Sequence, residues 1–457
     1  MLTLRGHPPQ FPEIDQDMLI TTLERYDFLP RFFRLALVNI LSNLMVPLSG
    51  LISVAFLGHL VEIRHLAGVT ISTILFNYIY RTLGFLRMGT TGMTAQAVGR
   101  EDEEAVLLTG LRNGILALGL GIAIVILQYP LQEIGFALLS AAPDVKASGQ
   151  AYYDARIWGA PATLLNFVLI GWFLGREQSG KVLLLSAVGN GANILLDTLF
   201  IVRWGWESAG AGLATAISQY LMLLIGMILV AREVHLKEVR AVARQLLDLS
   251  ALKAALALNR DIFIRTFAFL STFSIFINLS SAMGTTMLAE NALLLQVVTL
   301  AVYFIDGLAF ATESLAGIFR GKDDNEQLGS LVQISAGTSL ILGLTLALVF
   351  VLFPEPLFGV LTNHSEIIDS IHRYVSWLLP VLGFGSLAFI LDGYFLGLAE
   401  GPTIRSAALT ATLVGFVPMA IAGWLFHSSH LLWLAMSLFM AARVVTLGVQ
   451  VPRTLKG

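Results

Sequence analysis

Long apolar runs, broken by short polar stretches, recur along almost the whole chain. A bilayer core about 30 Å thick needs roughly 20 mostly apolar residues in each spanning helix. The runs, divided at Gly, Pro and charged residues, predict an all-α integral membrane protein with twelve transmembrane helices. The predicted spans are 33–57, 66–88, 108–131, 153–175, 182–203, 209–231, 262–283, 289–314, 330–353, 374–399, 404–426 and 430–451.

The more polar segments divide the chain into two halves. The first residues are polar, contain three prolines and lack the apolar core of a cleaved signal peptide. The predicted segments are a cytoplasmic tail at 1–27, an N-terminal six-helix lobe at 28–231, a cytoplasmic linker at 232–261, a C-terminal six-helix lobe at 262–451 and a short cytoplasmic tail at 452–457. Two connections, 131–150 and 353–368, predict short interfacial helices.

The distribution of basic residues predicts the orientation, because loops rich in Lys and Arg stay in the cytoplasm. With both termini inside, the outer segments carry few bases. They are Arg64, Lys146, Arg203 and Arg373. The linker alone carries Arg232, Lys237, Arg240, Arg244, Lys253 and Arg260. We therefore expect a multi-pass protein of the cell inner (plasma) membrane with both termini cytoplasmic.

Composition narrows the function classes. Hydrophobic residues make up 56% of the chain and charged residues 13%, which leaves little sequence for a soluble domain. A net charge of −3 without a dense basic cluster argues against a nucleic-acid partner. The absence of cysteine excludes disulfides, thiolate metal sites and cysteine nucleophiles. The histidines form no ligand set and no nucleophile elbow or phosphate loop is present, so we expect neither a metal site nor an enzyme.

A short phrase occurs twice, as GWFLG at 171–175 and GYFLG at 393–397, which is an offset of 222 positions. The same offset relates Leu66-Ala67 to Leu288-Ala289, and Gly99-Arg-Glu-Asp to Gly321-Lys-Asp-Asp. Three places in one register predict two six-helix repeats related by pseudo-twofold symmetry. Transporters of this architecture bind substrate between the repeats and alternate access by rocking.

Four acidic residues stand out within the predicted spans: Asp197, Asp306, Glu313 and Asp392. A carboxylate in hydrocarbon costs several kcal/mol unless it is paired or hydrated, so each acid is a functional hypothesis. None recurs at the offset of 222, because the equivalent positions hold Met419, Gly84, Thr91 and Ile170. The acids therefore mark where the two halves have specialised.

Asp197 belongs to the most informative polar cluster. Asn193 and Asp197 are spaced i, i+4 and share one helical face, with Asn190 one turn earlier. Thr215 in the next span is a further candidate ligand. An oxygen-rich cluster of this kind suits a proton or a small hard cation. The alternative is an aspartate that only hydrogen-bonds neighbouring helices.

In the second half, Asp306 and Glu313 are spaced i, i+7 and share a face. Glu313 lies near enough to the cytoplasm for its side chain to reach the interface. We expect Asp392 to form an ion pair that fixes helix register, and contact with substrate remains the alternative. Its candidate partners are Arg405, Arg81 and Arg87.

Pro47 interrupts the first span beside Ser49 and Gly50. A proline inside a helix removes one backbone hydrogen bond and permits a bend. We predict a hinge at Pro47, and a static kink remains the alternative.

Several phrases together resemble a known family. PLSGLISVAFLGHL, GFLRMGTTGMTAQAVG, GNGANILLD, LNRDIFIRT, FIDGLAFATESLAG and ILDGYFLG are similar to the multidrug and toxic compound extrusion (MATE) transporters of the DinF-like branch. The resemblance runs from about residue 30 to 450. It implies a secondary antiporter that exports amphipathic, often cationic compounds in exchange for protons or sodium ions, with the coupling ion as its only cofactor.

The resemblance also assigns residues. Asn193, Asp197 and Thr215 match the cation-site positions of the N-terminal lobe, and the three later acids match acids of the C-terminal lobe. One position departs: where the branch has an aspartate in the first span, this chain has Ser53, which cannot ionise. Coupling could then rest on Asp197 alone, shift to Asp306 and its neighbours, or be weak. We favour Asp197.

Two other functions remain open. A lipid or lipid-linked sugar flippase of the wider superfamily would need a large, cation-lined cavity. A membrane scaffold or receptor that does not transport would have lobes in tight contact with no cavity between them. For the transporter, the expected partners are a small organic substrate, the coupling ion and the lipid bilayer, and we expect a monomer.

Overall fold

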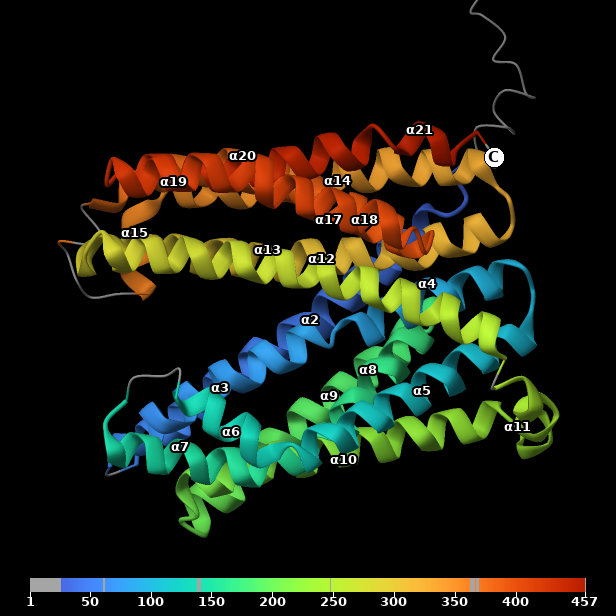
Figure 1. The fold of residues 1–457 in the computed structure, drawn as a ribbon, viewed down its shortest axis with the longest axis horizontal. Coiled ribbons are helices and arrows are strands. Elements are labelled where there is room, and N and C mark those ends of the chain that lie inside the picture. Colours follow the sequence, from blue (N-terminus) through green and yellow to red (C-terminus); the bar gives the residue numbers. More distant parts are fainter. Residues whose placement is uncertain are drawn as a thin grey trace, which may run out of the picture.

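The computed structural model describes residues 26–60, 62–137, 141–246, 248–361, 366 and 370–456. Nearly all of the predicted tail at 1–27 lies outside them. The described residues form helices and no strand, and they are arranged in two lobes that converge at one end of the molecule (Figure 1). The prediction of an all-α protein with two helical lobes is confirmed.

The described part of the N-terminal lobe is built from nine helices, some of which join end to end within one membrane span. In chain order they are α2 (Leu29–Gly58), α3 (Arg64–Thr82), α4 (Phe85–Gly99), α5 (Glu103–Ile126), α6 (Gln128–Ala137), α7 (Pro143–Arg156), α8 (Ala160–Gly175), α9 (Ser179–Asp197) with a π-helical extension to Arg203, and α10 (Glu207–Glu233). A 3-10 turn, Ile157–Gly159, joins α7 to α8, and α6 occupies the connection predicted to be an interfacial helix.

The C-terminal half repeats this order after the linker helix α11 (Leu236–Val242). Its helices are α12 (Leu249–Ala282), α13 (Thr285–Gly321), α14 (Asn325–Leu352), α15 (Pro354–Leu361), α17 (Leu378–Gly397), α18 (Gly401–Thr410), α19 (Val417–Leu425), α20 (Ser429–Gly448) and α21 (Val451–Thr454). A π-helical segment, Ala411–Phe416, joins α18 to α19. The predicted interfacial segment at 353–368 contains α15, and its later part lies mostly outside the described residues.

Eleven helices in the described part are long and apolar enough to cross a membrane. The remaining predicted span, 66–88, is formed by α3 and the start of α4. The break between these two helices lies at Leu83 and Gly84. Two helices begin ten or more residues earlier than predicted. α7 starts at Pro143, because proline suits the first helical turn, and α12 starts at Leu249, where Asp248 caps the helix by accepting from the Ser250 backbone N–H.

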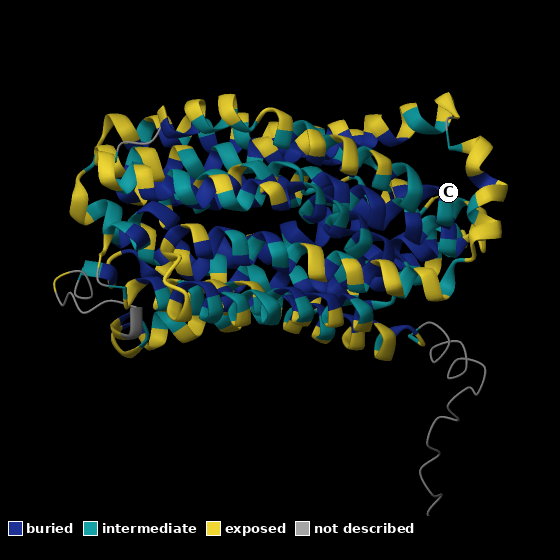
Figure 2. Cartoon of the chain, turned by 90° about the horizontal axis from the view of Figure 1, so that it is seen from below, coloured by how far each residue is buried: buried dark blue, intermediate teal, exposed yellow. Residues whose placement is uncertain are grey.

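The surface of the bundle is apolar, as a lipid-facing surface must be. Leu195 of α9 is 73% exposed and Phe426, just after α19, is 74% exposed. On the same helix as Leu195, Asp197 is only 1% exposed. Figure 2 shows buried residues concentrated within the bundle and exposed residues on its outer helices. α9 therefore turns leucine outward and carboxylate inward, which is the reverse of a helix at a water-facing surface.

The repeated phrase is explained by helix packing. Gly171 and Gly175 of α8 lie against α4, where a Cβ on Gly175 would come within 2.7 Å of the Thr91 backbone oxygen. Gly397 of α17 lies against the equivalent backbone oxygen of α13, that of Glu313. Small residues four apart let membrane helices approach closely. The glycines recur because both lobes use the same close helix contact.

The two lobes meet at glycines that are themselves equivalent. A Cβ on Gly99 would lie 2.9 Å from the Gly321 Cα, and a Cβ on Gly321 would lie 2.8 Å from the Gly99 Cα. Each residue contacts its own counterpart, as a pseudo-twofold axis requires. Gln96 beside them donates to the Gly397 backbone oxygen at 3.0 Å. We call this end of the bundle, which also carries α11, the linker end.

A larger residue at this contact will force the linker end apart. In Gly99→Val the added atoms meet the backbone of α13, and overpacking of this kind costs about 1–3 kcal/mol. Because the chain has no native cysteine, Gln96→Cys provides a single reporter. We expect Gly99→Val to accelerate its reaction with a water-soluble maleimide by at least about fivefold. Gly114→Val in α5, where a Cβ meets nothing within 4 Å, should leave the rate unchanged. Equal rates in both variants would contradict close packing of the lobes here.

Candidate functional site

A cavity of about 810 Å³ lies between the lobes. Its wall comes mainly from α2, α3, α7, α9 and α10 of the N-terminal lobe, and α13, α14 and α15 of the other lobe complete it. Apolar side chains alternate with hydroxyl and amide groups along this wall. Among the described lining residues only Asp197 and Arg156 carry a charge.

A ladder of polar pairs joins α2 to α9. Each pair spans 144 positions, so the two helices run in the same direction in constant register. The pairs are Ser42 with Ser186, Ser49 with Asn193, and Ser53 with Asp197. The Ser49 hydroxyl donates to the Asn193 Oδ1 at 3.1 Å. The face predicted for Asn193 and Asp197 is therefore directed at the first span.

One carboxylate oxygen of Asp197 accepts a hydrogen bond, and the other accepts none from the described residues. Its Oδ2 accepts from the Ser53 hydroxyl, and its buried Oδ1 has no hydrogen-bond partner among the described residues. A buried acceptor without a partner costs about 1–3 kcal/mol, and more when it is charged. Thr215 lies within 3.5 Å of the Asn193 amide nitrogen. One carboxylate among neutral oxygens is a suitable site for a proton or a monovalent cation.

The remaining predicted residues of the first lobe lie on the same cavity. Asn190 lines it and donates to the Ser186 backbone oxygen at 2.8 Å. Pro47 also lines it, and α2 continues through Pro47 without a break. The structure thus places Ser53, where the branch has an aspartate, directly opposite Asp197.

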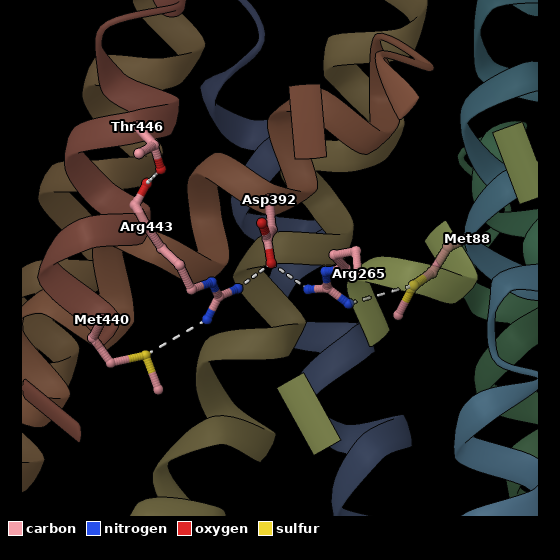
Figure 3. Close-up of polar contacts among 6 residues, drawn as sticks. All are labelled: Met88, Arg265, Asp392, Met440, Arg443 and Thr446. Carbon is pink, nitrogen blue, oxygen red and sulfur yellow. Dashed lines mark hydrogen bonds and ion pairs between the residues drawn. The ribbon is translucent and has the colours of Figure 1, made fainter. Parts of the chain in front are cut away.

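Asp392 of α17 lies between two arginines (Figure 3). Its Oδ2 accepts from Arg265 of α12 and from Arg443 of α20, and all three side chains are buried. An ion pair was predicted, but the predicted partners are wrong. Arg405 instead pairs with Asp261 at 2.6 Å, because Asp392 faces the interior of its lobe, whereas Arg405 lies near the linker end.

Glu313 does not reach the membrane surface, contrary to the prediction. It is 1% exposed, and its Oε2 lies 3.5 Å from Nη1 of Arg87 on α4, so the pair bridges the two lobes. Asp306 is half-buried and has no direct ion pair in the described part of the chain. Neither residue, nor Asp392, lines the cavity. Asp392 therefore belongs to the helix packing of the C-terminal lobe and Glu313 to its contact with α4, whereas Asp306 joins neither ion pair.

Arg156 was missed by the sequence reasoning. It lies in the predicted span 153–175, and the structure places it on the cavity wall. Its guanidinium lies 4.4 Å from the centroid of the Phe76 ring, and its Nη1 donates to the Tyr152 hydroxyl at 2.7 Å. The available signal was an arginine at membrane depth, which deserves the same scrutiny as an intramembrane acid.

Comparison with known proteins relates both lobes to one family. The MatE family model matches residues 39–199 and 262–421, two blocks separated by nearly the interval of the repeated phrase. The chain is 33% identical over 417 residues to DNA damage-inducible protein F of Escherichia coli K12, covering 91% of this chain and 90% of that protein. It is 24% identical over 346 residues to the probable multidrug resistance protein NorM of Thermotoga maritima, covering 74% of this chain and 73% of the relative.

Solved structures share the fold. A MOP superfamily transporter from Pyrococcus furiosus superposes with a TM-score of 0.84 at 21% identity, covering 93% of this chain and 96% of that one. An outward-facing multidrug resistance MATE transporter superposes with a TM-score of 0.82 at 21% identity, covering 93% and 96%. Because the family model matches both lobes and the bacterial relative aligns along nine-tenths of the chain, this protein belongs to the MATE family of multidrug and toxin efflux transporters.

Proposed function

We propose that this chain is an ion-coupled antiporter that exports small amphipathic organic compounds by alternating access. The observation that carries the proposal is the cavity between the lobes, on whose wall Asp197 presents a buried oxygen without a partner. A cavity framed by two repeats suits a rocking carrier, and an open carboxylate within it suits an exchangeable ion.

We assign the coupling ion, a proton or a sodium ion, to Asp197. Ser53, Asn193 and Thr215 would supply neutral oxygens around it. Ion and cargo then share one cavity, so occupancy by one can alter binding of the other. Such reciprocal coupling between two ligands is what antiport requires.

The orientation follows from the basic loops. We place both termini and the linker end on the cytoplasmic side of the inner membrane. In this arrangement the lobes are closed toward the cytoplasm at Gly99 and Gly321, and the cavity faces outward. The structure would then represent the state that releases cargo.

The first experiment replaces the carboxylate. Purified protein in vesicles is given a pH or sodium gradient and three dansyl probes that share one apolar body: dansylglycine, dansylamide and dansylcadaverine, which are anionic, neutral and cationic. We expect gradient-driven exchange of at least one probe, and a loss of at least about tenfold in Asp197→Asn, because an amide cannot exchange a proton or balance a cation. Exposed Asp144 on α7 provides the control Asp144→Asn. Normal exchange in Asp197→Asn would refute the assignment.

The two alternatives are less well supported. A flippase was expected to need a cation-lined cavity, whereas this wall holds one base and one acid among the described residues. A non-transporting scaffold was expected to have lobes in tight contact without a cavity, and the lobes enclose about 810 Å³. The family resemblance implies amphipathic, often cationic cargo, yet of the four intramembrane acids singled out in the sequence only Asp197 lines the cavity.

A further inference from the structure

Arg156 is a positive charge on the cavity wall that the coupling scheme does not use. It belongs to α7, and the structure records no carboxylate within 4.0 Å of it among the described residues. A guanidinium at membrane depth is costly unless it is paired or faces a hydrated cavity. A base that faces a substrate cavity without a counterion is therefore available to an anion.

Aromatic rings hold the guanidinium in position. Arg156 lies 4.4 Å from the Phe76 ring centroid, 5.5 Å from that of Tyr152 and 5.8 Å from that of Tyr80. Phe76 and Tyr80 are themselves stacked at 5.7 Å on α3. Of its five N–H donors, one is bonded to the Tyr152 hydroxyl. Stacking restricts the orientation of the planar group while leaving donors free.

The other charges do not oppose an anion at this place. Asp306, Glu313 and Asp392 are outside the cavity lining, and Asp392 is neutralised by its two arginines. Asp197, the one acid on the wall, is the residue assigned to the coupling ion. A neighbouring crevice between α3 and α12 shares Asn77 with the cavity, and its one charged lining residue among those described is again basic, Arg81.

We propose that Arg156 binds the carboxylate of an amphipathic organic anion, so that the exported compounds carry a negative rather than a positive charge. The inference rests on the proposed export function and specifies its substrate class. The planar fork of arginine pairs with both oxygens of a carboxylate. The apolar body of such a compound would lie against Val69, Leu300 and Phe350, which line the same cavity from both lobes.

Binding of the three dansyl probes, measured by fluorescence on purified protein without any ion gradient, tests this proposal. We expect the wild type to bind dansylglycine more tightly than dansylamide, and dansylamide more tightly than dansylcadaverine. Arg156→Gln should weaken dansylglycine binding about 10- to 100-fold, as expected for loss of charge-assisted hydrogen bonds, and leave dansylamide within about twofold. Arg156→Lys should be intermediate, because lysine keeps the charge and loses the fork.

Two controls separate the possible failures. Arg240→Gln, on exposed α11, removes an equal charge far from the cavity and should change no affinity. Retained dansylamide binding shows that Arg156→Gln has folded. Asp197→Asn removes the one acid on the described cavity wall, so it should bind dansylglycine no more weakly than the wild type even where exchange is lost, and failure of coupling is distinct from failure of recognition. Preference of the wild type for dansylcadaverine, failure to bind dansylglycine, or unchanged dansylglycine affinity in Arg156→Gln would each overturn the proposal.

Discussion

Asp392→Asn will destabilise the protein by about 3–5 kcal/mol, because it leaves two buried guanidinium groups without a counter-charge. Arg265 and Arg443 both donate to the same carboxylate oxygen and lie on either side of it (Figure 3). Three phenylalanine rings, Phe269, Phe389 and Phe439, lie between 5.1 and 5.7 Å from the Arg443 guanidinium, so little water can replace the lost anion. The helices α12, α17 and α20 depend on this one acid.

The variant Arg443→Met tests whether the lost counter-charge causes this destabilisation. It removes one of two positive charges and leaves Asp392 and Arg265 as a neutral pair, while methionine fills much of the volume of the arginine stem. We expect it to cost roughly 1–2 kcal/mol, less than Asp392→Asn. Thermal unfolding of the purified variants in detergent measures the order, with exposed Asp144→Asn as the unchanged reference. If Arg443→Met proves the more destabilising, the aspartate is not the centre of the cluster.

The fold was largely predictable because membrane helices follow from local hydropathy. Even so, the rule misjudged where helices begin. The polar residues at 143–152 suggested a connection, yet they form the first turns of α7, and the linker was drawn across the start of α12. Hydropathy detects the part of a helix within lipid, whereas capping and proline decide where the helix starts.

The repeat was visible in sequence for a structural reason. Residues at the close contacts of α8 with α4 and of α17 with α13 must be small in both lobes, so the glycines remained alike while their surroundings diverged. The acids have no such constraint. Asp197 and Met419 occupy equivalent positions, and only the N-terminal half has an acid there.

Site residues were predictable only where their partners share a helix. The spacing of Asn193 and Asp197 showed their common face, and the structure adds Ser49 and Ser53 as what that face meets. The partners of Asp392 depend on how α12 and α20 are rotated against α17, which no local pattern encodes. Arg156 was not predicted, because its neighbours Phe76 and Tyr80 lie on another helix, α3.

Ser53→Asp will change the number of ions exchanged for each molecule of cargo. The serine hydroxyl already donates to Asp197, so an aspartate at this position places a second carboxylate against the first. Two adjoining carboxylates can take up two protons, or one proton and one cation, where the native site holds a single ionisable group. At a tenfold ion gradient and zero membrane potential, one ion per cargo supports about a tenfold cargo gradient at equilibrium, and two ions support about a hundredfold gradient.

Vesicles clamped at zero potential, loaded with whichever dansyl probe exchanges best, measure this limit directly. Ser53→Asn is the matched control, because it adds nearly the same volume without a charge and should stay at about tenfold. The double variant Ser53→Asp with Asp197→Asn moves the single carboxylate from α9 to the facing position on α2. If the number of carboxylates matters more than their position, this variant should exchange one ion for each molecule of cargo. A limiting gradient in Ser53→Asp equal to that of the wild type would show that the ion count is set elsewhere. Asp306, which has no direct ion pair in the described chain, would then be the next residue to replace.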